Sequence, residues 1–163
     1  GIAAMTAHGQ PPGHGVRSRA ALGGHPLHPM MVPFPLAFLT AALVTDALFV
    51  VRDNAFWAQM SYWLLMAGTI TGVLAAVLAL VDFLILKAPR SYAAGWIHFL
   101  GNAGVLVLSA GNVLLRVGQP ASAVLPWGLV LSAVVTALLV VTGWCGGELS
   151  YRHKIGVIPG GDG

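Results

Sequence analysis

Two histidines that could bind a metal or a cofactor stand three positions apart, directly before the first long apolar stretch of the chain. They are His25 and His28 in the segment Gly24-His-Pro-Leu-His-Pro, and a proline follows each of them. Because proline disfavours the α region for the residue before it, both histidines are expected in extended backbone. In a polyproline-like segment that rises about 3.1 Å per residue, they face the same side about 9 Å apart. This separation is wide for one small metal ion, but it suits two neighbouring sites, or one ligand and one supporting residue.

The composition places these histidines at the edge of a membrane. The chain has 163 residues, of which 57% are hydrophobic and only 8% are charged, whereas a soluble domain carries about 25% charged residues. An integral membrane protein of one domain is therefore expected.

The single cysteine, Cys145, cannot form an internal disulfide. The basic residues do not cluster with aromatic residues, so no nucleic-acid partner is predicted. Signatures of serine hydrolases, phosphate-binding loops and zinc proteases are absent from the sequence, and whether the chain is an enzyme stays open.

Four apolar stretches are long enough to cross a membrane as helices, which takes about 20 residues each. Charged or proline-containing breaks separate them. Residues 1–24 are polar and rich in glycine and proline, and they are expected to form a mobile arm. Residues 25–158 are expected to form the membrane bundle, and residues 159–163 a loose end. The expected spans are Pro29–Val51, Trp57–Leu86, Ala93–Val117 and Ala121–Cys145, with the last helix able to continue towards His153.

Short connections between the spans predict antiparallel neighbours. The expected fold class is therefore all-α, an integral membrane antiparallel four-helix bundle with both termini on the same side, named side A. Six basic residues belong to side A and two to the opposite side B, which predicts a cytoplasmic side A by the positive-inside rule. The basic residues of side A are Arg17, Arg19, Lys87, Arg90, Arg152 and Lys154, and those of side B are Arg52 and Arg116.

This topology gathers most of the chemically active side chains at side A. Asp82 lies about one turn before the second span ends, and His98 lies about one turn into the third span. Ionisable residues at membrane depth are rare and usually functional. The alternative interpretation is that these side chains lie among lipid headgroups. The complete set is His25, His28, Asp82, His98, Glu148 and His153.

The third span carries one polar or small face along an otherwise apolar helix. Such a stripe is expected to face the bundle interior. Towards side B, Asp46 of the first span lies about as deep as Asn112, with Arg116 near the same surface. A polar contact between these residues is predicted, because an unpaired carboxylate in hydrocarbon is costly. It is either a structural staple or part of a proton or ion relay. The stripe comprises Gly95, His98, Asn102, Val105, Ser109, Asn112 and Arg116.

The two ends of the bundle carry motifs that resemble a known family. The opening Gly24-His-Pro-Leu-His-Pro-Met, Asp82 at the end of the second span, and the closing segment from Gly143 to Val157 are similar to an uncharacterised bacterial family of four-helix membrane proteins, a domain of unknown function. The resemblance covers about residues 22–158. Family members often have His-Phe-Pro where this chain has Pro33-Phe34-Pro35, so a site that needs that histidine is not expected here. Some relatives are fused to Rieske iron–sulfur domains, so the resemblance implies a redox context.

Three functions fit these residues. The first is an integral membrane haem b protein for electron transfer, because haem iron accepts axial histidines and helix bundles house cofactors. His98 is the first expected ligand and His28 its partner, while His25 and His153 would serve a second site or, with Arg90 and Arg152, the haem propionates. The second is a non-haem zinc, copper or iron site, and the third is a cofactor-free transporter or partner-scaffolding subunit. The candidate ligands of the non-haem site are His25, His28, His98, His153, Asp82 and Glu148.

The sequence also indicates where the protein works and with what. The expected location is the bacterial cytoplasmic (inner) membrane, with the lipid bilayer as the first partner. A Rieske-type protein is the redox partner that the resemblance implies. Under the transporter hypothesis a homodimer is expected, because four spans with short loops are small for a transporter.

Overall fold

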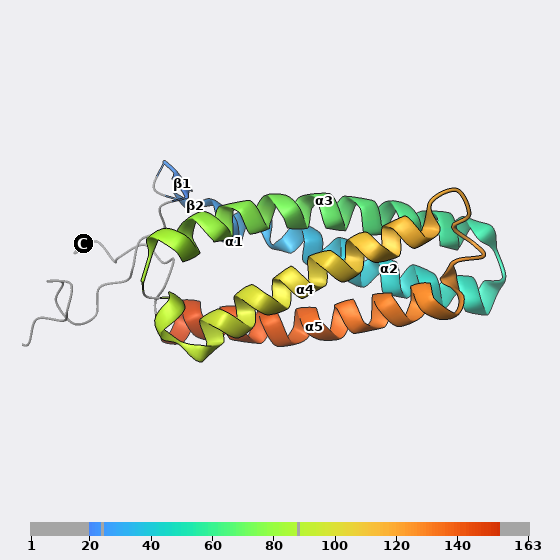
Figure 1. Ribbon diagram of the computed structural model, residues 1–163. Coiled ribbons are helices and arrows are strands. Elements are labelled where there is room, and N and C mark those ends of the chain that lie inside the picture. Colours follow the sequence, from blue (N-terminus) through green and yellow to red (C-terminus); the bar gives the residue numbers. More distant parts are fainter. Residues whose placement is uncertain (1–19, 24, 88, 154–163) are drawn as a thin grey trace, which may run out of the picture.

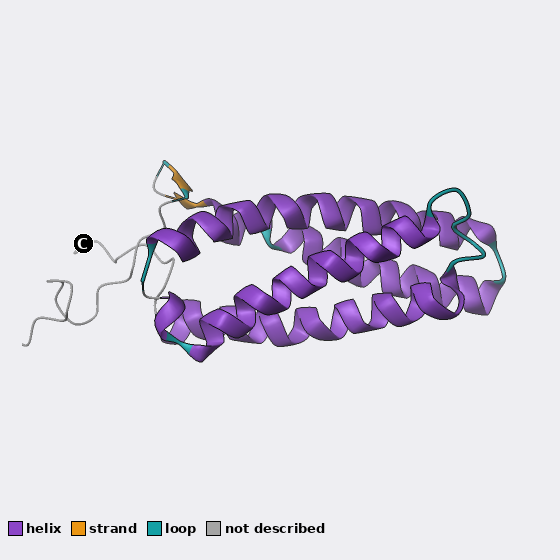
Figure 2. Cartoon of the chain, in the orientation of Figure 1, coloured by secondary structure: helices purple, strands orange, loops and turns teal. Residues whose placement is uncertain are grey.

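The computed structural model describes residues 20–23, 25–87 and 89–153, and these residues are almost entirely helical (Figures 1 and 2). Four helices are long and apolar enough to cross a membrane, namely those over Leu27–Arg52, Ala55–Ile85, Ala93–Arg116 and Val124–Arg152. The expected all-α membrane bundle is thereby confirmed. The loose end at 159–163 and all of the expected arm except residues 20–23 fall outside the described residues.

The observed elements begin and end within a few residues of the expected spans. Two short strands pair antiparallel before the bundle, with Ala21 opposite Pro26 and Leu22 opposite His25. Irregular turns of helix lie at the bundle ends. In chain order the elements are β1 (Ala21–Leu22), β2 (His25–Pro26), α1 (Leu27–Met31), α2 (Pro33–Arg52), α3 (Ala55–Ile85), η1 (Pro89–Ser91), α4 (Ala93–Arg116), η2 (Val124–Gly128), α5 (Leu129–Gly147) and η3 (Glu148–Arg152).

The turn between α2 and α3 shows why the first long helix stops where it does. Asp53 adopts the left-handed conformation with φ 47° and donates its backbone N–H to Phe49, which closes the helix. Asn54 then caps α3, because its side-chain oxygen accepts the backbone N–H of Phe56 at 2.9 Å. The break expected at residues 52–54 is therefore made by local capping chemistry.

The expected extended backbone at both opening histidines is wrong for His28. His25 lies in β2, but His28 lies in α1, a short helix whose N-cap Pro26 is extended. Pro29 is tolerated in the first turn of α1 because its missing N–H would have no helical partner there. The Nδ1 atom of His28 bonds the carbonyl of Ala75 in α3 at 2.9 Å. This tertiary contact offsets the local preference of a residue before proline for extended backbone.

The helices form an antiparallel bundle in which α2 packs on α3 and α5, and α4 packs on α3 and α5. Close approach between α2 and α3 depends on Gly68, because a Cβ atom there would lie 2.6 Å from Cδ2 of Leu39. Outward side chains are large and apolar, as expected of a surface that faces lipid. The buried core draws on all four long helices and consists of Leu39, Ala42, Leu65, Val105, Val113, Val135 and Leu139.

Different segments and connections lie at the two ends of the bundle. The β1–β2 hairpin, α1, η1 and the end of α5 lie together at one end, which is side A (Figure 1). The α2–α3 turn and the α4–α5 connection lie at the opposite end, side B (Figure 1). Both ends of the described chain therefore belong to side A, in agreement with the expected up-and-down topology.

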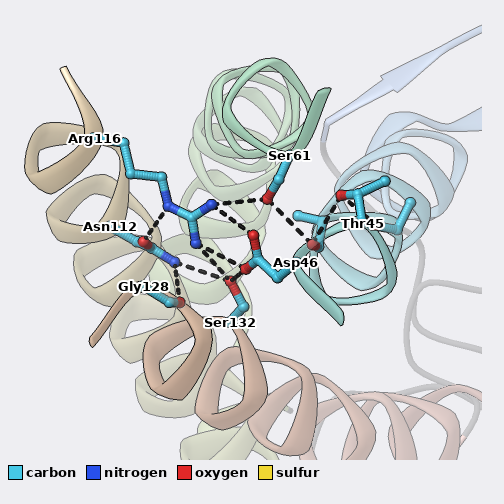
Figure 3. Close-up of polar contacts among 9 residues, drawn as sticks. Thr45, Asp46, Ser61, Asn112, Arg116, Gly128 and Ser132 are labelled. Carbon is cyan, nitrogen blue, oxygen red and sulfur yellow. Dashed lines mark hydrogen bonds and ion pairs between the residues drawn. The ribbon is translucent and has the colours of Figure 1, made fainter. Parts of the chain in front are cut away.

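A buried ion pair near side B joins the helices to one another (Figure 3). Asp46 of α2 accepts two hydrogen bonds from Arg116 of α4, Oδ1 from Nη1 at 2.6 Å and Oδ2 from Nη2 at 2.8 Å. Both side chains are 0% exposed. Ser61 of α3 accepts from Arg116 Nη1 at 2.9 Å, and Ser132 of α5 donates to Asp46 Oδ2 at 2.7 Å. The predicted contact of Asp46 with Arg116 is confirmed, and every long helix contributes to it.

The remaining donors of this network are also satisfied. Arg116 donates Nε–H to Asn112 Oδ1 at 2.9 Å and a further Nη2–H to Ser132 at 3.4 Å, so all five N–H donors of a guanidinium have partners. Asn112 donates to the Gly128 carbonyl at 3.1 Å and to Ser132 Oγ at 3.0 Å. A buried charge pair is tolerable when its hydrogen-bonding capacity is filled in this way. The completeness of the network favours the structural-staple interpretation over the relay.

Breaking this ion pair should destabilise the bundle far more than replacing both partners. Asp46→Ala leaves the Arg116 guanidinium buried and uncompensated, and we expect a loss of about 3–5 kcal/mol in the free energy of unfolding. The double variant Asp46→Leu/Arg116→Met removes both charges and should recover most of that loss. Unfolding of the detergent-solubilised protein, followed by circular dichroism, measures both values. Equal loss in the single and double variants would contradict the prediction.

The distribution of basic residues predicts which end of the bundle faces the cytoplasm, and labelling tests that prediction. In a Cys145→Ser background, a cysteine at exposed Gln119 on side B should react with a membrane-impermeant maleimide in intact spheroplasts. A cysteine at exposed Arg90 on side A should react only after permeabilisation. Reaction of both positions from the same face would show that the topology is wrong.

Candidate cofactor site

Two of the predicted site histidines meet at side A. His28 comes from α1 and His98 from the first turns of α4. Their ring centroids are 6.2 Å apart, and the ring planes are nearly perpendicular at 84°. Both side chains are half-buried. The fold therefore brings together two imidazoles that are 70 positions apart in the sequence.

Both rings are held by the same kind of hydrogen bond. His28 Nδ1 lies 2.9 Å from the Ala75 carbonyl oxygen, and His98 Nδ1 lies 2.8 Å from the Thr142 carbonyl oxygen. Because a carbonyl can only accept, each Nδ1 must carry the proton, and in the neutral ring Nε2 then has a free lone pair. Within the described part of the chain, neither Nε2 has a hydrogen-bond partner. This arrangement is the one that metal-ligating histidines adopt.

The surroundings of His98 fix the position of its ring. A Cβ atom at Gly146 of α5 would lie 2.8 Å from Cε1 and 2.9 Å from Nδ1 of His98, so only glycine leaves room for the ring there. Asn102, one turn later on α4, donates its side-chain amide to the His98 carbonyl at 2.7 Å. Gly146, which belongs to the closing motif, therefore leaves the space that the His98 ring occupies.

The spacing of the two rings is compatible with a shared ion. An imidazole that ligates through Nε2 has its centroid roughly 3.2 Å from the ion, given a metal–nitrogen bond of about 2.0–2.1 Å. Two ligands of one ion then have centroids between roughly 5 Å (tetrahedral) and 6.4 Å (opposite one another) apart. The observed distance of 6.2 Å lies near the upper end of that range.

The other predicted residues of side A are not part of this pair. Asp82 accepts the backbone N–H of Ala20 at 3.1 Å and so anchors the β1 segment. His25 is exposed, and its Nδ1 lies 3.1 Å from the Gly23 carbonyl. Arg90 donates to the Leu84 carbonyl at 3.2 Å.

A second cluster forms where α4 begins and α5 ends. His153 stacks on Tyr92, with ring centroids 3.8 Å apart at 25°, and its Nε2 lies 4.0 Å from Glu148 Oε1. Arg152 is largely exposed and contacts the same Glu148 oxygen at 3.4 Å. The residues predicted as one side-A set are thus divided between a histidine pair and a histidine–glutamate cluster.

The candidate non-haem ligands do not converge. In residues 20–23, 25–87 and 89–153, no group of three or more His, Cys, Asp or Glu side chains is placed to hold one ion.

Sequence reasoning missed two contributors to these polar clusters. Ser61 shares the helical face of Gly68 and Gly72 on α3, so the same periodicity could have indicated it. Tyr92 lies in the connection before α4, where no periodicity applies.

The chain matches one protein-family model, described as "Predicted membrane protein (DUF2231)", over residues 24–159. No curated protein and no solved structure matches the chain. The match includes both histidines of the pair and the whole of the His153–Glu148 cluster. The resemblance noted from the opening and closing motifs is confirmed at this level, and the chain belongs to this family of predicted membrane proteins.

Proposed function

We propose that this protein binds haem b in the membrane and transfers electrons, with His28 and His98 as the two axial ligands. The observation that supports the proposal is the pair of imidazoles 6.2 Å apart whose Nδ1 atoms are both bonded to backbone carbonyls. The two histidines would hold the haem iron between them, each through its Nε2 atom.

The number of available ligands favours haem over a non-haem ion. Haem supplies four nitrogen ligands itself and needs only two from the protein. Zinc sites use three or four protein ligands, and the described residues offer no such group. A two-histidine site is therefore better matched to haem than to zinc, copper or non-haem iron.

The protein residues around the pair have three roles in this proposal. The carbonyls of Ala75 and Thr142 fix the tautomer of each histidine and make it more basic, which strengthens it as a ligand. Gly146 leaves space for the His98 ring. The half-buried position of both rings restricts water, which otherwise competes for Nε2. When bound, the haem iron would supply reversible one-electron transfer.

The proposal also includes a redox partner, a membrane and an oligomeric state. A membrane electron carrier needs a redox partner, and the family resemblance favours a Rieske-type protein in that role. The excess of basic residues on side A favours a histidine pair near the cytoplasmic face, and the resemblance to a bacterial family favours the bacterial cytoplasmic membrane. A homodimer belongs to the same proposal, with the pair within one chain.

Optical spectroscopy tests the proposal directly. The protein purified from haem-supplied cells should show a Soret band and, after reduction with dithionite, sharp α and β bands. His28→Ala and His98→Ala should each abolish or shift these bands, because each removes one axial ligand. His25→Ala is the matched control, since it removes an exposed histidine three positions away, and it should leave the spectrum unchanged.

Two results would overturn the proposal. One is the absence of a Soret band together with stoichiometric zinc, copper or iron, which would favour a non-haem site. The other is a haem spectrum that persists in the His28→Ala/His98→Ala double variant. Size-exclusion profiles that match the unsubstituted protein show that each variant is folded.

A further inference from the structure

We infer that a cavity at side A binds the hydroquinone head group of a membrane quinol. The cavity has a volume of about 290 Å³ and lies between the start of α4 and the turn η3. That volume is close to the lower end of the range for small-molecule sites, about 300–1,000 Å³. Its lining residues are Tyr92, Ala93, Ala94, Ile97, Cys145, Glu148 and His153.

The walls of the cavity suit a flat aromatic ring. Ala93, Ala94 and Ile97 provide an apolar side that comes from one turn of α4. Tyr92 and His153 provide an aromatic side, because their rings are stacked 3.8 Å apart. A ring that is apolar on its faces and polar at its edge would contact both kinds of surface.

The polar groups are placed to bind a hydroxyl. Glu148 Oε1 and His153 Nε2 are 4.0 Å apart, which is too far for a direct hydrogen bond. An oxygen atom placed about 2.8 Å from each of them completes a triangle on that base, so one hydroxyl can bond both. It would donate to the Glu148 carboxylate and accept from the imidazole. Among the described residues, no hydrogen bond reaches the second carboxylate oxygen, Oε2.

The charge of the cavity selects against other ligands. A carboxylate in the wall repels phosphate or carboxylate groups, and Arg152, which partly balances it, does not line the cavity. Glu148, His153 and Cys145 do not form a group that could hold a metal ion. A neutral ligand with a hydroxyl donor is therefore favoured, and a hydroquinone carries two.

An exposed apolar face lies beside the cavity. It lies at the end of two membrane-spanning helices, where a lipid-soluble molecule can keep its tail in hydrocarbon and its head group at the interface. Ile97 lines the cavity and is itself 48% exposed on the outer face of α4, and the exposed Trp96 and Leu100 flank it. An isoprenoid tail can follow this apolar face. The inference depends on this cavity alone and stands without haem at the His28–His98 pair.

Photolabelling tests the inference without any redox readout. The protein in detergent is irradiated with a tritiated azidoubiquinone that carries a ten-carbon chain, and labelled peptides are identified. Label should concentrate in residues 92–97 and 145–153. Decylubiquinol should suppress the labelling, whereas decanol, which has only the tail, should not. Decylubiquinol should also compete at lower concentration than decylubiquinone, because only the hydroquinone can donate to Glu148.

Variants locate the interaction on the cavity. Glu148→Leu removes the acceptor, so it should weaken competition by decylubiquinol about tenfold, as expected for loss of a hydrogen bond to a charged group, and should remove its advantage over decylubiquinone. Ala94→Phe fills the cavity and should abolish specific labelling. Tyr151→Phe is the control, because Tyr151 is 89% exposed and does not line the cavity. Labelling that spreads over all lipid-facing helices, or that is equal in Ala94→Phe and Tyr151→Phe, would overturn the inference.

Discussion

The buried ion pair between Asp46 and Arg116 constrains how the four helices can be arranged. Its bonds to Ser61 and Ser132 mean that each long helix supplies at least one polar atom to a network that has no contact with solvent. In hydrocarbon, an unmet charge or N–H group costs several kcal/mol. Rotating or sliding any one helix would leave such a group unmet. The network therefore selects one register among the many that purely apolar helix faces would tolerate.

The two ends of the bundle differ in whether their polar atoms have hydrogen-bond partners. Near side B the charged and polar atoms of the network pair with one another. At side A the histidine pair keeps both Nε2 atoms without partners among the described residues, and Glu148 faces His153 across 4.0 Å without a bond. Unfilled hydrogen-bonding and ligating capacity near a membrane surface is a signature of a functional site. The candidate site therefore lies at the end of the bundle opposite the ion pair.

The spans and the Asp46–Arg116 contact could be predicted from sequence because both depend on strong, periodic signals. Apolar length defines a membrane helix, and helical spacing places Asn112 and Arg116 on one face of α4. The conformation of His28 could not be predicted, because a tertiary bond to Ala75 opposes the local effect of Pro29. The division of the side-A residues into a histidine pair and a histidine–glutamate cluster could not be predicted either. Periodicity indicates which face of a helix is polar, but it does not indicate which loops lie close together. Tyr92 was missed for the same reason.

The polar stripe of α4 explains how one helix can serve both ends. His98, Asn102, Ser109, Asn112 and Arg116 follow one another at helical spacing, so α4 presents a single polar face along its length. Arg116 at one end is fixed by the ion pair, and the α-helix transmits that fixed rotation to His98 about 27 Å away, at 1.5 Å per residue. Gly146 and Thr142 of α5 then meet the His98 ring at a defined position. The candidate ligand and the ion pair therefore share one face of α4, and contacts with α5 hold the His98 ring in place.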